Sequence, residues 1–153
     1  MFLKYLMILF LSITTNQKEF IKNFDNEGNL TSEGWMLNDK KTDFWTFYYS
    51  NGVVKKKGHY SNDKKTDYWY FYAKNSKLLR EGSYKNDKAN DWWIFYNDNK
   101  KVKCQFQDDE KNGYSLIYQN NRLQKAEHYK SNKKVGEWTS YFSFKRDNPN
   151  LKF

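Results

Sequence analysis

Residues 33–56 read EGWMLNDKKTDFWTFYYSNGVVKK, and the chain goes on to repeat this pattern. Residues 57–80 read KGHYSNDKKTDYWYFYAKNSKLLR, and residues 81–103 read EGSYKNDKANDWWIFYNDNKKVK. More divergent copies follow at 104–125 and 126–144, and a partial copy precedes them at 20–32. Self-similarity at a fixed period is the signature of a repeat architecture, in which each unit contacts its neighbours. The sequence therefore predicts one repeat domain.

Aromatic and glycine positions keep one register through the copies. The tryptophan position is held by Trp45, Trp69 and Trp93, is replaced by Ser115, and returns at Trp138. A tyrosine follows it in every copy: Tyr48, Tyr72, Tyr96, Tyr118 and Tyr141. Structural glycines are expected at Gly34, Gly58, Gly82, Gly113 and Gly136. We expect these aromatic residues to form ladders along the array and to supply its interaction surface.

Each unit carries the signals of a β-hairpin. Its aromatic run favours a strand, a polar run such as Asn38–Asp43 favours a turn, and Asn51-Gly52 is a strong hairpin signal. Strands are predicted near 44–49, 68–73, 92–97, 114–118 and 137–142, each paired with a flanking strand. The expected fold is all-β: a single-layer, meandering antiparallel sheet of ten or eleven strands, built from about five hairpin repeats of 22–24 residues.

Alternation along a strand assigns each ring to a face. Trp45 and Phe47 share one face, whereas Phe44 and Tyr48 point to the other. A ring in one unit then lies beside its counterpart in the next, and the glycines leave room for a ring against bare backbone. Stability is expected from these stacked ladders and does not require a central core.

The unit Gly-x-Tyr, polar turn, Asp/Gly-x-Trp-x-x-Tyr, Asn-Gly turn resembles the MORN repeat. It is most similar to the MORN-variant repeats of bacterial proteins often classed as YwqK-type antitoxins. The resemblance covers residues 20–144, where Gly113 and Gly136 match the family's glycine and Asp43, Asp67 and Asp91 replace it. It implies a hairpin-repeat scaffold with a protein partner, and an antitoxin- or immunity-like role as one version of that function.

Composition narrows the classes of protein further. Lys plus Arg number 27 against 18 Asp plus Glu, a net charge of +9, and 20% of the residues are aromatic. So many rings argue against a disordered chain, and the mean hydropathy of −1.10 argues against a thick aliphatic core. The single Cys104 excludes an internal disulfide framework and a cysteine-based zinc site, and it is expected to be a small buried residue.

The N-terminal segment has the pattern of an export signal. In residues 1–16 a basic Lys4 precedes an apolar run too short to span a membrane. The prediction is a signal peptide at 1–16, a repeat domain at 17–153, and a location in the periplasm, the envelope or outside the cell. The alternative is that this run is a first strand or helix of the domain.

Catalytic and metal-binding patterns are missing from the sequence. It has no His-Glu-x-x-His, no Gly-x-Ser-x-Gly, no phosphate-binding loop and no Cys/His cluster. His59 and His128 hold equivalent positions that vary between copies, which is typical of a solvent-facing strand position. The aspartates before the tryptophans recur once per unit and are interpreted as turn residues. We therefore expect no enzyme activity, no metal and no cofactor.

The lysine pairs Lys40-Lys41, Lys64-Lys65 and Lys133-Lys134 place positive charge in the polar turns. With the interleaved rings they could serve single-stranded nucleic acid or anionic lipid, but the favoured interpretation is that they solvate turns and block edge aggregation. Nucleic acid is the less expected partner.

Two hypotheses remain: a non-enzymatic scaffold that binds a protein partner, or an exported module that binds glycan or cell wall through the aromatic ladder.

Overall fold

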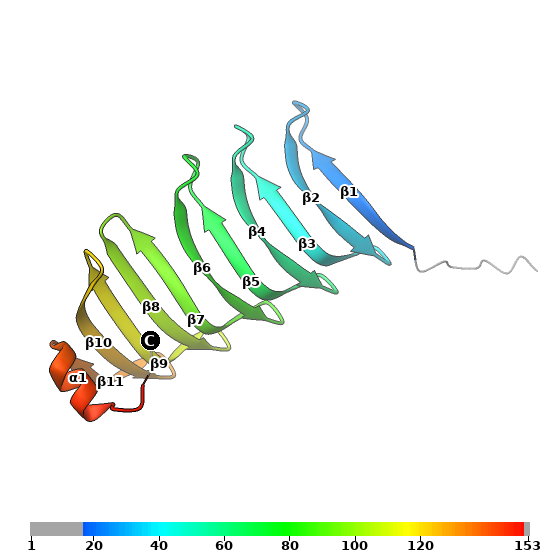
Figure 1. Cartoon of the computed structure of the whole chain (residues 1–153). Coiled ribbons are helices and arrows are strands. Elements are labelled where there is room, and N and C mark those ends of the chain that lie inside the picture. The colour runs from blue at the N-terminus through cyan, green and yellow to red at the C-terminus, as the bar shows by residue number, and fades with distance from the viewer. Residues whose placement is uncertain (1–16, 152–153) are drawn as a thin grey trace, which may run out of the picture.

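The structure is a computed structural model that describes residues 17–151, so the predicted signal peptide lies outside the described residues. Within this range the chain forms one open sheet of eleven antiparallel strands in sequence order, followed by a short helix (Figure 1). The strands are β1 Lys18–Phe24, β2 Leu30–Leu37, β3 Lys40–Tyr48, β4 Val54–Ser61, β5 Lys64–Tyr72, β6 Leu78–Lys85, β7 Lys88–Asn97, β8 Lys100–Gln107, β9 Glu110–Gln119, β10 Arg122–Lys130 and β11 Lys133–Trp138, and the helix is α1 Tyr141–Asp147. The predicted all-β meander of hairpins is confirmed.

One end of the hairpins is closed by two-residue turns. Asn38 and Asp39 have φ of 51° and 59°, as type I′ turns require at both central positions, and later turns repeat this geometry. The strand resumes at Lys40, so the prediction that all of Asn38–Asp43 is turn was wrong. A type I′ turn matches the twist of its strands, which lets pairing continue to the last residue before it.

The polar run nevertheless contains a break in pairing. From Gly34–Trp45 the register jumps to Trp35–Thr42, which leaves Asp43 and Phe44 without partners on β2. Asp43 lies in the left-handed region with φ of 52°, and Gly113 takes the matching place in β9 with φ of 109°. Aspartate tolerates this backbone better than most residues. It can therefore replace glycine at this β-bulge, as Asp67 and Asp91 also do.

The turn residues also link one repeat to the next. Asp63 accepts a hydrogen bond from the Lys41 amide at 2.8 Å through its side chain, and its own amide donates to the Lys41 carbonyl at 3.0 Å. The same pair of contacts joins Asp87 to Lys65. These two turns thus hydrogen-bond to the second strand of the preceding repeat.

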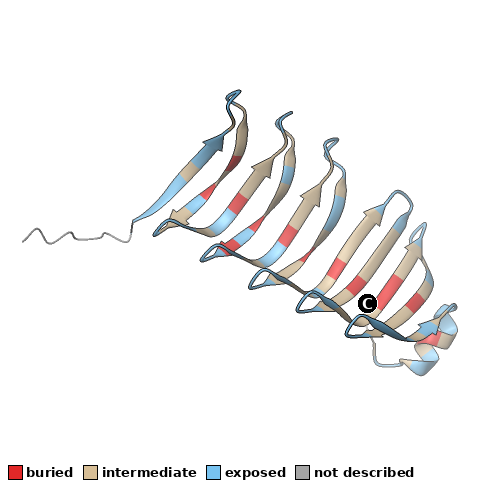
Figure 2. Ribbon diagram, turned by 180° about the vertical axis from the view of Figure 1, so that it is seen from behind, coloured by how far each residue is buried: buried red, intermediate tan, exposed pale blue. Residues whose placement is uncertain are grey.

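The core is a row of tryptophans on one face, which we call the tryptophan face. Trp45, Trp69 and Trp93 are at most 2% exposed, although the sheet has a single layer. Each ring lies flat against a glycine of the preceding strand, because a Cβ on Gly34, Gly58 or Gly82 would lie 2.3 Å from it. Figure 2 shows the buried residues as bands in the middle of the strands.

Neighbouring rings and cations cover these tryptophans. Tyr60 meets Trp45 and Trp69 edge-on, with ring centroids 6.3 and 5.0 Å apart, and Phe47 lies beside both. Lys41 stands 5.3 Å from the Trp45 ring. Some of the turn lysines are therefore part of the packing on this face, where a cation over a ring is favourable.

The C-terminal end departs from the predicted pattern. Cys104, Ser115 and Glu127 continue the row of Gly82 and Trp93 across the sheet by direct pairing. At the last bulge the register shifts by one residue, at Val135, instead of two. Glu137 therefore pairs with Glu127 in the tryptophan position, and Trp138 falls on the opposite face.

The prediction of a strand at 137–142 was wrong. β11 ends at Trp138 and α1 begins at Tyr141. Ser140 is the N-cap, and its side chain accepts a hydrogen bond from the Ser143 amide at 3.1 Å. Such a cap favours a helix start. Tyr141 is consequently an exposed helix residue outside the tyrosine ladder.

Candidate functional site

The face opposite the tryptophans carries a second line of rings and is called the open face. One aromatic residue per hairpin lies there at the same repeat position: Phe20 on β1, Phe44 on β3, Tyr68 on β5 and Trp92 on β7. Phe20, Phe44 and Tyr68 are 47%, 41% and 36% exposed. These four residues are referred to below as the aromatic row.

Strand pairing sets the spacing of the row. Strands neighbour one another at about 4.7–4.9 Å, so backbone positions two strands apart recur at about 9.4–9.8 Å. Between the rings lie the residues paired with them, such as Trp35 beside Phe20 and His59 beside Phe44. Their ring centroids are 5.3 and 5.2 Å apart, so these side chains form part of the same surface.

Lysines border the row on the side of the type I′ turns. Lys40, Lys64 and Lys88 are exposed and each lies four residues before the ring of its strand, so alternation places them on the open face. Within residues 17–151, neither Lys40 nor Lys64 has an acidic group within ion-pair distance, and Lys88 lies 4.0 Å from Asp108. The row is therefore flanked by positive charge that recurs with the same period.

The other border consists of tyrosine hydroxyls and charged residues. Tyr48 donates to Glu33 and Tyr96 donates to Glu81, each at 2.6 Å. Burial, reinforced by Glu33, raises the pKa of Tyr48 to about 12. Burial and the nearby Glu81 raise the pKa of Tyr68 to about 12 as well. These phenols are therefore protonated at neutral pH, and those of Tyr48 and Tyr96 donate their protons to the glutamates of this border.

Helix α1 covers the C-terminal end of the open face. Its Phe144 is fully buried, with ring centroids 5.7 Å from Tyr114 and 5.3 Å from Trp138. Tyr114 is the residue of β9 that continues the aromatic row. Leu116 and Ala126 complete the socket for Phe144. The chain thus provides its own example of a segment docked on this face.

Ala126 explains why the helix binds at this end. The residue in its place on the earlier even-numbered strands is Glu33, Lys57, Glu81 or Lys103, as the pairing with Thr46, Tyr70, Ile94 and Leu116 shows. A long charged side chain fills the space that Phe144 occupies above Ala126. The uncovered part of the face therefore offers rings bordered by charges and lacks such a socket.

The predicted ladder residues divide between the two faces. The core residues are Trp45, Trp69 and Trp93. The side chains of the ladder tyrosines lie half-buried on the open face: Tyr48, Tyr72, Tyr96 and Tyr118. Gly34, Gly58 and Gly82 lie under the rings, and Gly113 occupies the bulge. Gly136 pairs with His128, near Trp138. Trp138 lies under α1, away from the other tryptophans.

Sequence reasoning missed the aromatic row as an accessible surface. The available signal is that the residue before each ladder tryptophan is also aromatic, in Phe44-Trp45, Tyr68-Trp69 and Trp92-Trp93. Because alternate residues face opposite sides, a doubled ring places one in the core and the other on the surface.

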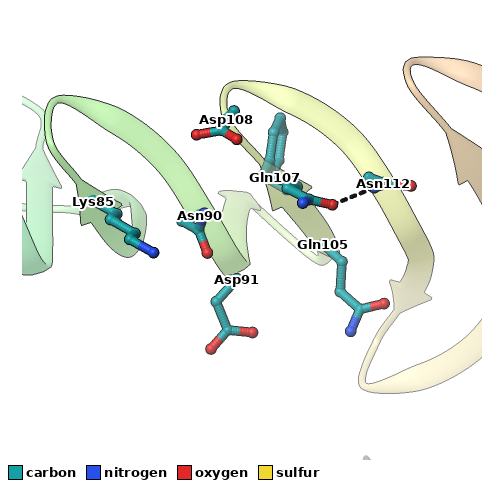
Figure 3. Close-up of a pocket in the computed structure, with 8 residues that line it drawn as sticks. Lys85, Asn90, Asp91, Gln105, Gln107, Asp108 and Asn112 are labelled. Atoms are coloured by element: carbon teal, nitrogen blue, oxygen red, sulfur yellow. Dashed lines mark hydrogen bonds between the residues drawn. The ribbon is translucent and has the colours of Figure 1, made fainter.

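A polar pocket lies near the type I′ turns of β6 to β9 (Figure 3). Its lining includes Lys85, Asp91, Gln105, Gln107 and Asn112. Asn112 donates to Gln107 at 2.6 Å, and the Tyr114 amide donates to Gln105 at 2.7 Å. These amides support the bulge at Gly113. Because these lining side chains already hydrogen-bond within the sheet, we interpret the pocket as a structural feature of the bulge.

The structure also gives the positions of the two histidines and the cysteine. His59 is exposed, His128 stacks on Tyr114 with centroids 4.6 Å apart, and Cys104 is buried. In the described part of the chain, no three His, Cys, Asp or Glu side chains are arranged to hold a metal ion. Among residues 17–151 there is also no helix of sufficient length and apolar character to span a membrane.

Comparison of the chain with protein-family models and with curated proteins gave no match. The function is therefore argued from the open face itself.

Proposed function

We propose that the protein is a non-enzymatic, MORN-like repeat scaffold that binds a protein partner along the open face. The observation that carries the proposal is the aromatic row, which is exposed at Phe20, Phe44 and Tyr68 and continues through the half-buried Trp92 into the surface that α1 covers. Exposed apolar patches with polar borders mark interaction sites, and aromatic residues are enriched at protein interfaces. The docking of α1 through Phe144 supports a polypeptide as the occupant.

The antitoxin- or immunity-like version of this function is part of the proposal. An exported scaffold would have its partner in the envelope or outside the cell, whereas an antitoxin that restrains an intracellular toxin would have to remain inside. The export signal proposed for residues 1–16 favours the first location.

A second candidate is a glycan- or cell-wall-binding module. It is favoured by one observation, the even spacing of exposed rings between hydrogen-bonding side chains. Rings of this kind can stack on sugar faces. The row at Phe44 and Tyr68 would then take the role first expected of the buried tryptophans.

The two candidates are separated by cross-linking. A photoreactive phenylalanine at position 68, and a control one at position 142, are introduced into the full chain and exposed to an envelope fraction. Phe142 is 84% exposed on α1 and lies outside the row. We expect one protein to be cross-linked from position 68 alone, and the purified protein to bind the wild type and to lose affinity for Tyr68→Ala. Equal cross-linking from both positions, or retention on insoluble wall material that depends on Tyr68, would count against a protein partner.

A further inference from the structure

The spacing of the aromatic row restricts the conformation of the peptide that it can hold. Four rings on β1, β3, β5 and β7 span three intervals of about 9.4–9.8 Å, or roughly 28–29 Å in all. A segment that runs along the row must present a side chain to each ring at this interval. The backbone conformations available to a polypeptide differ in whether they can do so.

Polyproline II comes closest to the required period. It has three residues per turn and rises about 3.1 Å per residue, so every third side chain recurs at about 9.3 Å on the same side. Across the row the accumulated mismatch is about 0.3–1.5 Å. An α-helix repeats after about two turns, or 10.8 Å, and would be displaced by roughly 3–4 Å. Alternate residues of an extended strand recur at about 6.4–6.8 Å and fall out of step at the second ring.

The surroundings of the row indicate the charge of the segment. Lys40, Lys64 and Lys88 border it with the same period, and the chain as a whole carries a net charge of +9. Glu33 and Glu81 on the other border are engaged by tyrosine hydroxyls. Asp43, next to Phe44, is paired with Lys18, whereas Asp67 and Asp91 are exposed beside their rings. Acidic side chains are therefore complementary to the lysine border in particular.

The length of the site is set by the helix. α1 closes the open face at Tyr114, and Trp92 packs half-buried against the cluster beneath the helix, so the row open to a partner runs from Phe20 and ends at the partly exposed Trp92. A span of roughly 28–29 Å corresponds to about ten residues of polyproline II.

We propose that the aromatic row binds a polyproline-II segment of a partner protein, with proline or another apolar residue at every third position and acidic residues between. This inference rests on the proposed function and names the partner's chemistry. Flat aromatic surfaces suit such a segment because it is preformed and loses little conformational entropy on binding. Lys64 and its equivalents pair with the acidic residues, and the rings pack against the prolines.

The test uses the full chain and a synthetic peptide of four Pro-Pro-Glu triplets, about 37 Å long. Two control peptides have the same length and charge: one with the glutamates moved out of the triplet pattern, and one that forms an α-helix. We expect saturable binding of the triplet peptide, weaker binding of the permuted peptide and no measurable binding of the helical one. Affinity for the triplet peptide should fall as salt is raised. Equal binding of the helical peptide would overturn the inference.

Exposed side chains supply variants that should fold normally. Phe44→Ala and Tyr68→Ala are each expected to lower affinity for the triplet peptide by at least about fivefold, as residues that contribute to an interface do. Phe142→Ala, on α1, is the matched control and should bind as the wild type does. Lys64→Glu should weaken binding and reduce its salt dependence, whereas Lys74→Glu, in a loop at the other end of the hairpins, should not. Unchanged circular dichroism and melting temperature verify each fold.

The outcomes separate this inference from the function on which it rests. If the triplet peptide fails to bind while the protein cross-linked from position 68 still requires Tyr68, the polyproline inference is wrong and the proposed function stands. If Tyr68→Ala changes neither interaction, both are wrong. If the row retains a polysaccharide in place of either polypeptide, both are overturned in favour of the glycan-binding module.

Discussion

In the middle of the sheet Trp69 is buried against Gly58 on the tryptophan face, whereas at the C-terminal end Leu116 and Ala126 are buried beneath Phe144 on the open face. Both regions belong to one continuous sheet with the same hairpins. They differ in which side excludes water. In the middle, the sheet excludes water by itself, because the tryptophan ring of one strand lies over a glycine of the neighbouring strand. At the end Ser115 replaces the tryptophan, and a helix supplies the cover instead.

The comparison shows how a repeat array of one layer can end. Internal repeats need a neighbour on each side to complete their packing, and terminal repeats of such arrays are usually atypical. Here the last repeat moves its apolar side chains to the open face, where α1 lies across β10 and β11. The tryptophan face at this end carries the ion pairs of Lys125 and Lys134 with Glu127 and Glu137.

The largest effect is expected at the central tryptophan. Trp69→Ala should lower the free energy of unfolding by about 3–5 kcal/mol, because it empties a fully buried site that both neighbouring repeats share. Trp138→Ala should cost less, since that ring is partly exposed and packs against α1. His59→Ala should change stability by less than about 0.5 kcal/mol, as an exposed strand residue does. Denaturant melts of the three variants check the order, and equal losses at Trp69 and Trp138 would contradict it.

The glycine under the ring should come next. Gly58→Ala is expected to destabilise the fold by about 2–3 kcal/mol, because the added Cβ would lie 2.3 Å from Trp69 and force the ring or the strand to move. Cys104→Ala is the matched control, because that position of the same row already carries a side chain. It should cost about 1 kcal/mol or less. A tolerated Gly58→Ala would show that the ring can leave the glycine without loss.

A smaller, local effect should follow when the last repeat is made like the others. Ala126→Lys fills the Phe144 socket with the kind of residue found at Lys57 and Lys103, and should release α1 at a cost of about 2 kcal/mol. Hydrogen exchange should then be faster in the helix and β11 but unchanged in β3 to β7. Lys103→Ala, on the other side of Leu116, should leave α1 in place. Retained protection of the helix in Ala126→Lys would mean that the socket does not hold it.

The smallest expected effect is on the stability of the fold at acid pH. Burial raises the pKa of Glu127, but hydrogen bonds from Lys125 and Tyr129 outweigh it and leave that pKa below 4.5, and hydrogen bonds from Lys134 and Lys125 lower the pKa of Glu137. The folded state therefore binds fewer protons than the unfolded state. This stabilisation is present above about pH 4.5 and is lost as the pH falls through the folded values.

We expect a weak acid-induced loosening at β10 and β11. It should be reduced in Glu137→Gln, and by added salt because Glu137 and Lys134 are largely in solvent. Melting temperature measured between about pH 6 and pH 3 for wild type and variant checks it. An identical pH profile for the two would remove the ion network as the cause.

Most of the fold could be predicted from the sequence because its determinants are local. The aromatic runs, the paired turn residues and the 24-residue period specify hairpins, their order and the face of each ring within a strand. Even the substitution of Asp43 for a glycine is readable, since aspartate is among the few residues that accept a left-handed turn position. These properties depend on neighbours along the chain.

The faces at the C-terminal end depended on pairing between strands, which the sequence period does not reveal. Trp138 follows Ser115 by 23 residues and looks like its counterpart. The bulge at Val135, however, is one residue shorter than the earlier bulges, so Glu137 occupies the tryptophan position instead. Because side chains alternate with a period of two, a shift of one residue moves a ring to the other side of the sheet.

The open face was likewise decided by tertiary structure. The doubled rings place Phe44 and Tyr68 on the face opposite the tryptophans, but no local sequence states which part of that face a segment such as the one carrying Phe144 will cover. Phe144 is buried because Ala126, distant along the chain, leaves space beneath it, whereas rings bordered by Glu33, Lys57 and Glu81 remain in solvent. Residue type along the chain determined the strands and the rings that they carry. Burial required the space left by residues on other strands, and that space exists only once the sheet has formed.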